Sequence, residues 1–266
     1  MLDLEFAQVS DPGVMREHNE DCLGHVLPQT PQEARAHGWL FALADGVGGQ
    51  DRGEIASSTA IETLLNGFRT AIRGEPLSSL LPRLVQTANT AVFEKGLGTG
   101  PAGCSMATTV VACALRYDRA IVSHAGDSRC YLIRQGYSAP LTRDHTVVNE
   151  QLRLGLLSAR EAARAETSHL LSRSLGGDMF LTVETSEHQL YPGDLLLLSS
   201  DGLHNSVSTD DICQVTAAAS DLDKAAHELV ALAKQRDGSD NISVQLIRVR
   251  DVERVGMYRG RHYKLQ

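Results

Sequence analysis

The sequence predicts an α+β fold, a layered sandwich of antiparallel sheets with helix pairs on the outside. The main observation is the order of the expected elements: strands, two helices, strands, two helices and a last strand. The composition, with 42% hydrophobic and 22% charged residues in a chain of 266, is typical of a globular protein with an ample core. No repeat or low-complexity linker divides the chain, so a single domain is the simpler interpretation.

The first half of the chain is expected to form three strands and a helix pair. The strands are expected at residues 4–10, 22–27 and 39–44. The last of these is a short apolar run that ends at Asp-Gly, which indicates a buried strand. Residues 29–38 are expected to form a polar loop. Apolar residues at helical spacing predict helices at 53–72 and 76–95.

The second half is expected to contain most of the strands. They are expected at residues 106–116, 119–125, 129–134, 137–141, 181–190, 194–199 and 241–249. Residues 143–167 are polar and rich in alanine, which predicts short helices with an N-cap at Ser158. Two further helices are expected at about 208–219 and 221–235.

Charge, cysteine content and hydropathy exclude several classes of protein. Thirty-three acidic residues against twenty-five basic ones give a net charge of −8, which argues against a broad nucleic-acid interface. The five cysteines show no zinc-site spacing, so reduced thiols in a cytosolic protein fit best. The N-terminus lacks the basic and apolar regions of a signal peptide, and no apolar run is long enough to span a membrane. We therefore expect a cytoplasmic monomer that binds neither nucleic acid nor membrane.

Four segments each place an aspartate where a strand meets a loop. These are FALADG with Asp45, SHAGDSR with Asp127, LLSSDG with Asp201 and DGSDNIS with Asp240. Three follow apolar strands and the fourth precedes one. Because antiparallel neighbours bring the end of one strand beside the start of the next, all four carboxylates can collect at one edge of the sandwich.

Clustered carboxylates repel one another and are costly to desolvate, and bound cations remove that cost. Ligands that are all oxygen select hard ions such as Mg²⁺ or Mn²⁺, and the absence of His or Cys beside them disfavours zinc. Asp-Gly is also a common turn signal, which would explain any one aspartate alone. It does not readily explain Asp45, Asp201 and Asp240 together, while Asp127 is intermediate.

The segment from Arg16 to Asp21 reads REHNED and places a guanidinium beside several acids. A solvated loop with a local salt bridge is one interpretation. Next to a metal site, Arg16 would offer a planar fork for two phosphate oxygens, and Glu20 and Asp21 could hold metal-bound waters. A cation with paired metals and water suits the hydrolysis of phosphate esters.

With these motifs in order, the chain resembles a bacterial member of the metal-dependent serine/threonine protein phosphatase family (PPM, type 2C). The motifs are RxxNED at 16–21, ADGVGG at 44–49, ATT at 107–109, GDSR at 126–129, SSDGL at 199–203 and DN at 240–241. Each motif is weak alone, whereas the ordered set is specific and covers about residues 5–250. The resemblance implies a four-layer αββα sandwich, in which two antiparallel sheets are flanked by antiparallel helix pairs.

The resemblance also implies a role for each candidate residue. Asp45 would bridge two Mn²⁺ or Mg²⁺ ions, with the Gly46 carbonyl on one of them. Asp201 and Asp240 would complete the first site, and Glu20 and Asp21 would act mainly through coordinated water. The remaining assignments are a third, weaker ion at Asp127, the substrate phosphate at Arg16, and a mobile flap at about 145–177 that helps to set substrate preference.

One departure from the family concerns the leaving group. Many eukaryotic relatives carry a histidine just after the Asp-Gly, proposed as a general acid, and this chain has Val47 there. The proton must then come from water or another group. His18 and His145 are conceivable donors, although a surface or loop histidine is the favoured interpretation of each. Cys22 is interpreted as a strand residue and not as a nucleophile.

The expected activity is hydrolysis of phosphoserine and phosphothreonine on proteins by a metal-activated water, opposing a bacterial serine/threonine kinase or acting on its targets. The alternatives are a catalytically silent adaptor of the same fold that binds phosphoproteins, and, less favoured, a metal-stabilised structural protein. The catalytic domain is expected to span residues 1–250. Residues 251–266 form a mildly basic tail, expected to be a frayed terminus, with docking of an acidic partner as the alternative.

Overall fold

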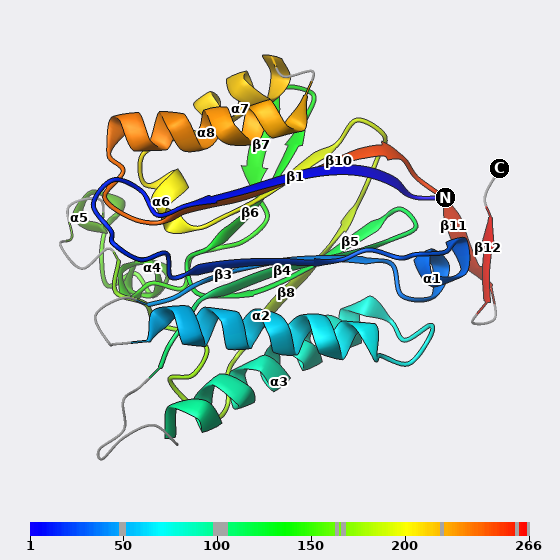
Figure 1. The fold of residues 1–266 in the computed structure, drawn as a ribbon, viewed down its shortest axis with the longest axis horizontal. Coiled ribbons are helices and arrows are strands. Elements are labelled where there is room, and N and C mark those ends of the chain that lie inside the picture. The colour runs from blue at the N-terminus through cyan, green and yellow to red at the C-terminus, as the bar shows by residue number, and fades with distance from the viewer. Residues whose placement is uncertain are drawn as a thin grey trace.

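Two five-stranded antiparallel sheets pack face to face in the computed structural model, and helices cover the outer face of each sheet (Figure 1). This arrangement confirms the predicted four-layer α+β sandwich. The backbone is described for the whole chain apart from residues 48–51, 98–105, 163–164, 166–168, 219–220, 259–260 and 265–266.

Each sheet combines strands from distant parts of the chain. The first sheet has the order β1-β10-β9-β6-β7, with β1 (Asp3–Asp11), β10 (Ile242–Asp251), β9 (Leu195–Ser199), β6 (Arg129–Arg134) and β7 (Tyr137–Pro140). The second has the order β2-β3-β4-β5-β8, with β2 (Asp21–Val26), β3 (Trp39–Asp45), β4 (Val110–Arg116), β5 (Arg119–Ala125) and β8 (Glu184–Gln189). All ten predicted strands are present. The strand expected from residue 106 begins at Val110, and the one expected from residue 181 begins at Glu184.

The four predicted long helices form the outer layers. Helices α2 (Gly53–Arg69) and α3 (Leu77–Leu97) cover the second sheet, and α7 (Thr209–Ala218) and α8 (Leu222–Arg236) cover the first (Figure 1). One apolar cluster lies under each helix pair, and a third lies between the sheets. Strand β9 is buried along its whole length because the core contacts it on both faces, which explains its unbroken run of leucines.

The structure corrects the prediction of a loop at residues 29–38. Helix α1 (Pro31–Ala36) lies there, with Pro31 in its first turn. The Thr30 hydroxyl accepts a hydrogen bond from Glu33 N (3.2 Å), and the Glu33 carboxylate accepts one from Gln29 N (2.8 Å). These contacts form a capping arrangement that stabilises a helix too short to show apolar periodicity.

The expectation of a frayed C-terminus is also wrong. Strands β11 (Val255–Tyr258) and β12 (Arg261–Lys264) form an antiparallel hairpin beside the N-terminus (Figure 1). Just before it, the Glu253 side chain is only 7% exposed and pairs with Arg35 of α1 (3.1 Å). The start of the tail is thus attached to a helix that the sequence pattern did not reveal.

The segment at 143–167 contains two short helices, as predicted: α4 (Val147–Arg153) and α5 (Ala159–Ala162). The expected cap is present, because Ser158 Oγ accepts from Glu161 N (3.3 Å) and Glu161 Oε2 accepts from Ser158 N (2.8 Å). A further one-turn helix, α6 (Asp201–His204), follows β9 directly and was not predicted. No helix in the described ranges is both long enough and apolar enough to cross a membrane.

Candidate metal centre

Five aspartates from separate segments meet at one edge of the sandwich. Asp21 opens β2 and Asp45 closes β3, and the two are cross-strand partners. Asp127 lies in the turn between β5 and β6, Asp201 begins α6, and Asp240 stands two residues before β10. The charges of the other four all act on Asp45. The structure therefore brings together the aspartates that the sequence singled out.

Burial and mutual repulsion make four of these carboxyls, those of Asp21, Asp45, Asp127 and Asp201, hard to ionise. Burial is the main cause at Asp45, whose pKa lies well above its ordinary value, and the neighbouring acids add to the effect. Burial likewise raises the pKa of Asp21 to about 6 and that of Asp127 to about 7, and it raises the pKa of Asp201. A cation at this edge would favour the ionised forms and relieve the repulsion.

The contacts of Asp21 provide a test of whether a cation fits. Ser200 Oγ donates to Asp21 Oδ2 (2.9 Å) and accepts from Ser243 N (2.9 Å), which fixes the carboxylate against β10. The other oxygen, Asp21 Oδ1, is buried and has no hydrogen-bond partner among the described residues. A buried carboxylate oxygen of this kind is costly unless something positive contacts it, and a hard cation is the ligand that it suits.

The backbone of Asp45 is held by the Thr-Thr pair just before β4. Thr108 Oγ1 donates to Asp45 O (2.8 Å), Thr109 N donates to the same oxygen (2.8 Å), and Thr109 Oγ1 accepts from Asp45 N (3.0 Å). Thr109 Oγ1 also lies 2.6 Å from Ser128 Oγ, beside Asp127. These bonds fix Asp45 without using its carboxylate, which stays available to bind cations.

Asn241 ties the N-terminal loop to the same edge. Its Nδ2 donates to the carbonyls of Pro12 and His18 (both 3.0 Å), and its Oδ1 accepts from Glu20 N (2.8 Å). Within this loop, Arg16 Nη2 donates to Asp240 Oδ2 (2.8 Å) across a partly exposed surface. Only one nitrogen of the guanidinium is used in this bond, so the group keeps donors for an anion.

Glu20 and Gly46 lie where α2 begins. Gly46 N donates to Glu20 O (3.1 Å), and a Cβ atom on Gly46 would come within 2.5 Å of the Gly53 backbone. A Cβ on Gly53 would lie 2.8 Å from the Glu20 carboxyl carbon. Both positions need glycine because the neighbouring atoms leave no space for a Cβ. Burial raises the pKa of the nearby Glu20 carboxyl.

Three supporting residues were not singled out from the sequence: Thr109, Ser200 and Asn241. Their letters were visible inside the motifs ATT, SSDGL and DN. Their function could not be inferred from the sequence, because it depends on hydrogen bonds between segments about 20 to 220 residues apart.

The structure separates the two histidines considered as proton donors. His18 is exposed in the N-terminal loop, as expected. His145 lies in a loop, as expected, but it is fully buried and not at the surface. Burial lowers the pKa of His145 to about 4, and its ring nitrogens already contact protein atoms. Cys22 lies half-buried in β2, as predicted.

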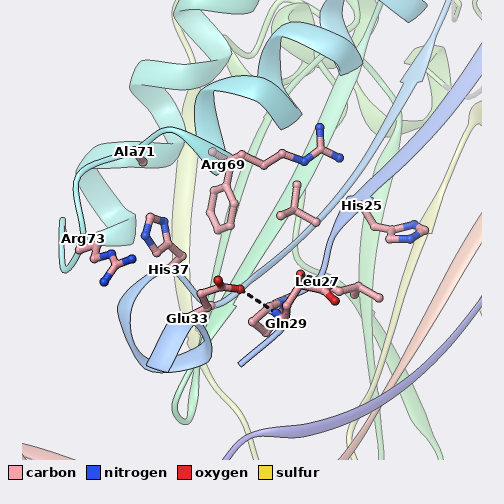
Figure 2. Close-up of a pocket in the computed structure, with 12 residues that line it drawn as sticks. His25, Leu27, Gln29, Glu33, His37, Arg69, Ala71 and Arg73 are labelled. Atoms are coloured by element: carbon pink, nitrogen blue, oxygen red, sulfur yellow. Dashed lines mark hydrogen bonds between the residues drawn. The ribbon is translucent and has the colours of Figure 1, made fainter. Parts of the chain in front are cut away.

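Two cavities differ in their relation to the carboxylates. One of about 290 Å³ opens beside Asp127, between α4 and α6. A larger one, of about 590 Å³, lies past the other end of β2, where His25, Glu33 and Arg73 line it (Figure 2). The length of β2 separates it from Asp21 by roughly 17 Å. Among its described lining residues Glu33 is the one acid, and it already caps α1, so these residues do not provide the carboxylate ligands found at the other edge.

Comparisons with known proteins show the family to which the chain is similar. The family model described as Protein phosphatase 2C matches residues 13–242. A serine/threonine phosphatase stp of Listeria innocua is 30% identical over 258 residues, covering 95% of this chain and 96% of its own length. Protein phosphatase PhpP of Streptococcus pneumoniae is 32% identical over 246 residues, covering 92% and 97%.

Solved structures give the same match in three dimensions. The serine/threonine phosphatase of S. agalactiae is 32% identical with a TM-score of 0.82, covering 93% of this chain and 100% of its own. The catalytic domain of the phosphatase PstP, solved in complex with 2 manganese ions, is 32% identical with a TM-score of 0.78, covering 94% and 100%.

Proposed function

Because the chain belongs to the protein phosphatase 2C family of metal-dependent serine/threonine protein phosphatases, we propose that it hydrolyses phosphoprotein monoesters at the carboxylate edge of the sandwich. The observation that carries the assignment to this edge is the convergence of four other buried or half-buried aspartates on Asp45. Oxygen ligands without nitrogen or sulfur favour Mn²⁺ or Mg²⁺.

Two ions would be held mainly by Asp45, with Asp201, Asp240 and the Gly46 carbonyl. Asp21 and Glu20 would act through water, although the unpartnered Asp21 Oδ1 also favours direct contact. Asp127 would contribute to a third, weaker ion. Paired ions of this kind lower the pKa of a coordinated water and neutralise phosphate charge.

The chain's own residues would orient the substrate and accept its charge. Arg16 lies at the edge of the cluster, where its unused guanidinium donors can bind two phosphate oxygens. Residues 14–18 around it are exposed, so a protein substrate can reach the guanidinium. Because His145 is buried and its pKa is low, solvent water is the better source of the proton for the serine or threonine leaving group.

The catalytic unit proposed here spans residues 1–250, with a flap at about 145–177, and acts as a monomer. Its substrates would be phosphoproteins made by a serine/threonine kinase, or the kinase itself. The small cavity beside Asp127 is partly lined by α4, so the flap could contact residues that flank the phosphorylated side chain.

The first test is metal-dependent turnover. Phosphate release from a phosphothreonine peptide should require Mn²⁺, stop on addition of EDTA and return when Mn²⁺ is restored in excess. Release should be measured together with peptide binding. Binding of the phosphopeptide with no release at any Mn²⁺ concentration would instead identify a silent adaptor.

A second prediction concerns Arg16. Arg16→Ala should raise the KM for a phosphopeptide roughly 10- to 100-fold, because a charge-assisted hydrogen bond contributes about 1.5–3 kcal/mol. Since Arg16 also pairs with Asp240, initial rates should be measured at saturating Mn²⁺. Arg16→Lys keeps the charge but loses the planar fork, so its KM should lie between those of the wild type and Arg16→Ala. An unchanged KM in Arg16→Ala would show that Arg16 does not bind the substrate phosphate.

A further inference from the structure

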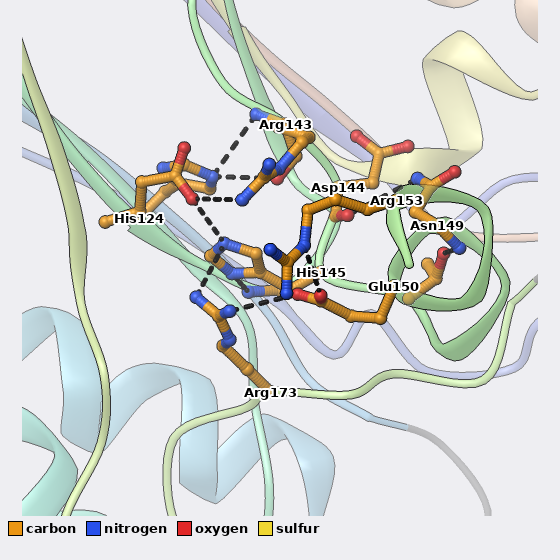
Figure 3. Close-up of polar contacts among 11 residues, drawn as sticks. His124, Arg143, Asp144, His145, Asn149, Glu150, Arg153 and Arg173 are labelled. Carbon is orange, nitrogen blue, oxygen red and sulfur yellow. Dashed lines mark hydrogen bonds and ion pairs between the residues drawn. The ribbon is translucent and has the colours of Figure 1, made fainter. Parts of the chain in front are cut away.

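His145 stands at the start of the flap and contacts the turn that carries Asp127. Its side chain has no exposed surface. Figure 3 shows it among polar contacts that also involve His124 of β5, Arg143 two residues before it and Arg173 of the flap. The mechanism proposed above gives it no function, although it is surrounded by charged groups.

His145 binds both polar backbone groups of Gly126. Its backbone N–H donates to Gly126 O (2.9 Å), and its ring Nδ1 accepts from Gly126 N (3.3 Å). Gly126 has φ of +110°, a conformation that other residues rarely adopt, and a Cβ there would lie 2.6 Å from Thr109. Because Gly126 immediately precedes Asp127, these two bonds define the direction in which the Asp127 backbone leaves β5.

These contacts also fix the state of the imidazole. Since Nδ1 accepts a hydrogen bond, the hydrogen of the neutral ring lies on Nε2 and can be donated to Glu184 Oε2 (3.2 Å). Glu184 accepts a further bond from Arg143 Nη2 (2.9 Å). Arg173 Nη1 lies 3.3 Å from His145 Nε2, but both groups are donors in this tautomer, so the Nε2 hydrogen goes to Glu184 and Arg173 bonds Glu150 instead. A charged ring would place a hydrogen on Nδ1 facing Gly126 N–H and a cation beside two arginines.

The same cluster could be mistaken for a second metal site. Ligand atoms of His124, His145 and Glu184 lie within 4.8 Å of one another. However, the two imidazole rings are stacked, with centroids 4.6 Å apart and planes at 11°. A metal ion must lie about 2.0–2.1 Å from each nitrogen, close to the plane of its ring, and two nearly parallel stacked rings share no such point. The cluster is therefore a hydrogen-bonded anchor.

His145 holds the flap as well. Its carbonyl accepts from Ser172 N (2.8 Å), so the outgoing and returning ends of the flap meet at this residue. Arg173, next to Ser172, donates to Glu150 of α4 (2.9 Å). One residue thus joins the flap ends to the backbone that supports Asp127.

We propose that His145 is a positioning residue. It binds Gly126 through ring Nδ1 and through its own backbone N–H, and thereby orients the Asp127 carboxylate toward the cation. It also links the flap to the backbone that carries Asp127. The inference rests on the proposed function in one respect, the assignment of Asp127 as a cation ligand. Because its side chain has no exposed surface, His145 would act through Gly126 and not by contact with the substrate.

Two substitutions separate the bonds of the ring. In His145→Asn, Oδ1 stands in the place of Nδ1, so the bond from Gly126 N is kept and the contact with Glu184 is lost. In His145→Gln the amide reaches toward Glu184, and the bond from Gly126 N is lost. Equilibrium dialysis against rising Mn²⁺, with Asp127→Asn as the reference, should show that His145→Gln weakens binding of the weak ion at least about tenfold, as outer partners of metal ligands commonly do. His145→Asn should bind it as the wild type does.

The tighter ions provide the folding control, because a His145→Gln protein that keeps them has an intact site. If Asp127→Asn loses the weak ion but His145→Gln retains it within about twofold, the role of Asp127 stands and the positioning role is overturned. Loss of the ion in His145→Asn as well would also overturn it. If Asp127→Asn binds as many ions as the wild type, the cation role of Asp127 fails, and the positioning claim falls with it.

A measurement on the metal-free protein tests the hydrogen bond between the His145 ring and Gly126 directly. The ¹⁵N shifts of the His145 ring in the metal-free protein should show a hydrogen on Nε2 and a bare Nδ1. A ring with its hydrogen on Nδ1, or a charged ring at neutral pH, would contradict the bond from Gly126 N to Nδ1, whether or not Asp127 binds a cation.

Discussion

Asp45→Asn should abolish phosphatase activity while making the metal-free protein more stable. The carboxylate has four acidic neighbours acting on it, and burial raises its pKa well above the ordinary value. An amide of the same shape removes a buried charge from this repulsion, so the temperature of unfolding in EDTA should rise. It also removes the central cation ligand. Turnover with Mn²⁺ should therefore fall by at least about 10³-fold, the upper end of what loss of a single electrostatic contact costs.

The opposite signs of the two effects distinguish this result from misfolding. Calorimetry with and without Mn²⁺ should show that the ion raises the unfolding temperature of the wild type and has little effect on Asp45→Asn. Asp210→Asn, an exposed change on α7, serves as the matched control and should leave activity and Mn²⁺ stabilisation unchanged. Near-normal Mn²⁺-dependent turnover in Asp45→Asn would show that the centre has been misassigned.

The sequence was informative where a pattern repeats or a motif is local. The apolar run of β3 predicted a buried strand, and Asp45, Asp127 and Asp201 could be placed at strand ends because they follow the expected strands β3, β5 and β9. Antiparallel pairing then predicted their convergence at one edge. This reasoning needs only the direction of each strand, which is why it succeeded without knowing the strand order.

Features that depend on single contacts between distant segments could not be predicted. Helix α1 is too short for periodicity and relies on a cap at Thr30, and the C-terminal hairpin follows an attachment through Glu253 and Arg35. The burial of His145 depends on Glu184, which is 39 residues away. Nothing in the letters around His145 indicates that Gly126 will need an acceptor at that point.

The metal-free form of Asp127→Asn should be more stable than the wild type at pH 8 and nearly equal to it at pH 4. Burial, together with the charges of Asp201 and Asp144, raises the pKa of Asp127 in the folded protein to about 7. In the unfolded chain the value is near 3.9. The folded state therefore binds the proton more tightly than the unfolded state, and ionisation of Asp127 destabilises the fold.

The direction of the pKa shift determines the pH range in which Asp127 destabilises the folded protein. Above about pH 7 the carboxyl is ionised in both states, and the destabilisation is fully present. As the pH falls from 7 towards about 4, the folded state takes up its proton first and the destabilisation disappears. The full difference between the two pKa values corresponds to roughly 4 kcal/mol at pH 8, as an upper limit.

Urea unfolding in EDTA at several pH values measures this effect as the difference between variant and wild type. Buried His145 and His204, whose pKa values fall to about 4 and about 3, destabilise both proteins as the pH drops below about 6.5, so the comparison cancels their contribution. With Mn²⁺ present the order should reverse at pH 8, because the cation stabilises the wild-type carboxylate. Equal stability of the two proteins in EDTA at pH 8 would mean that Asp127 is not held in a repulsive, desolvated cluster, and the case for a cation at this position would lose its physical basis.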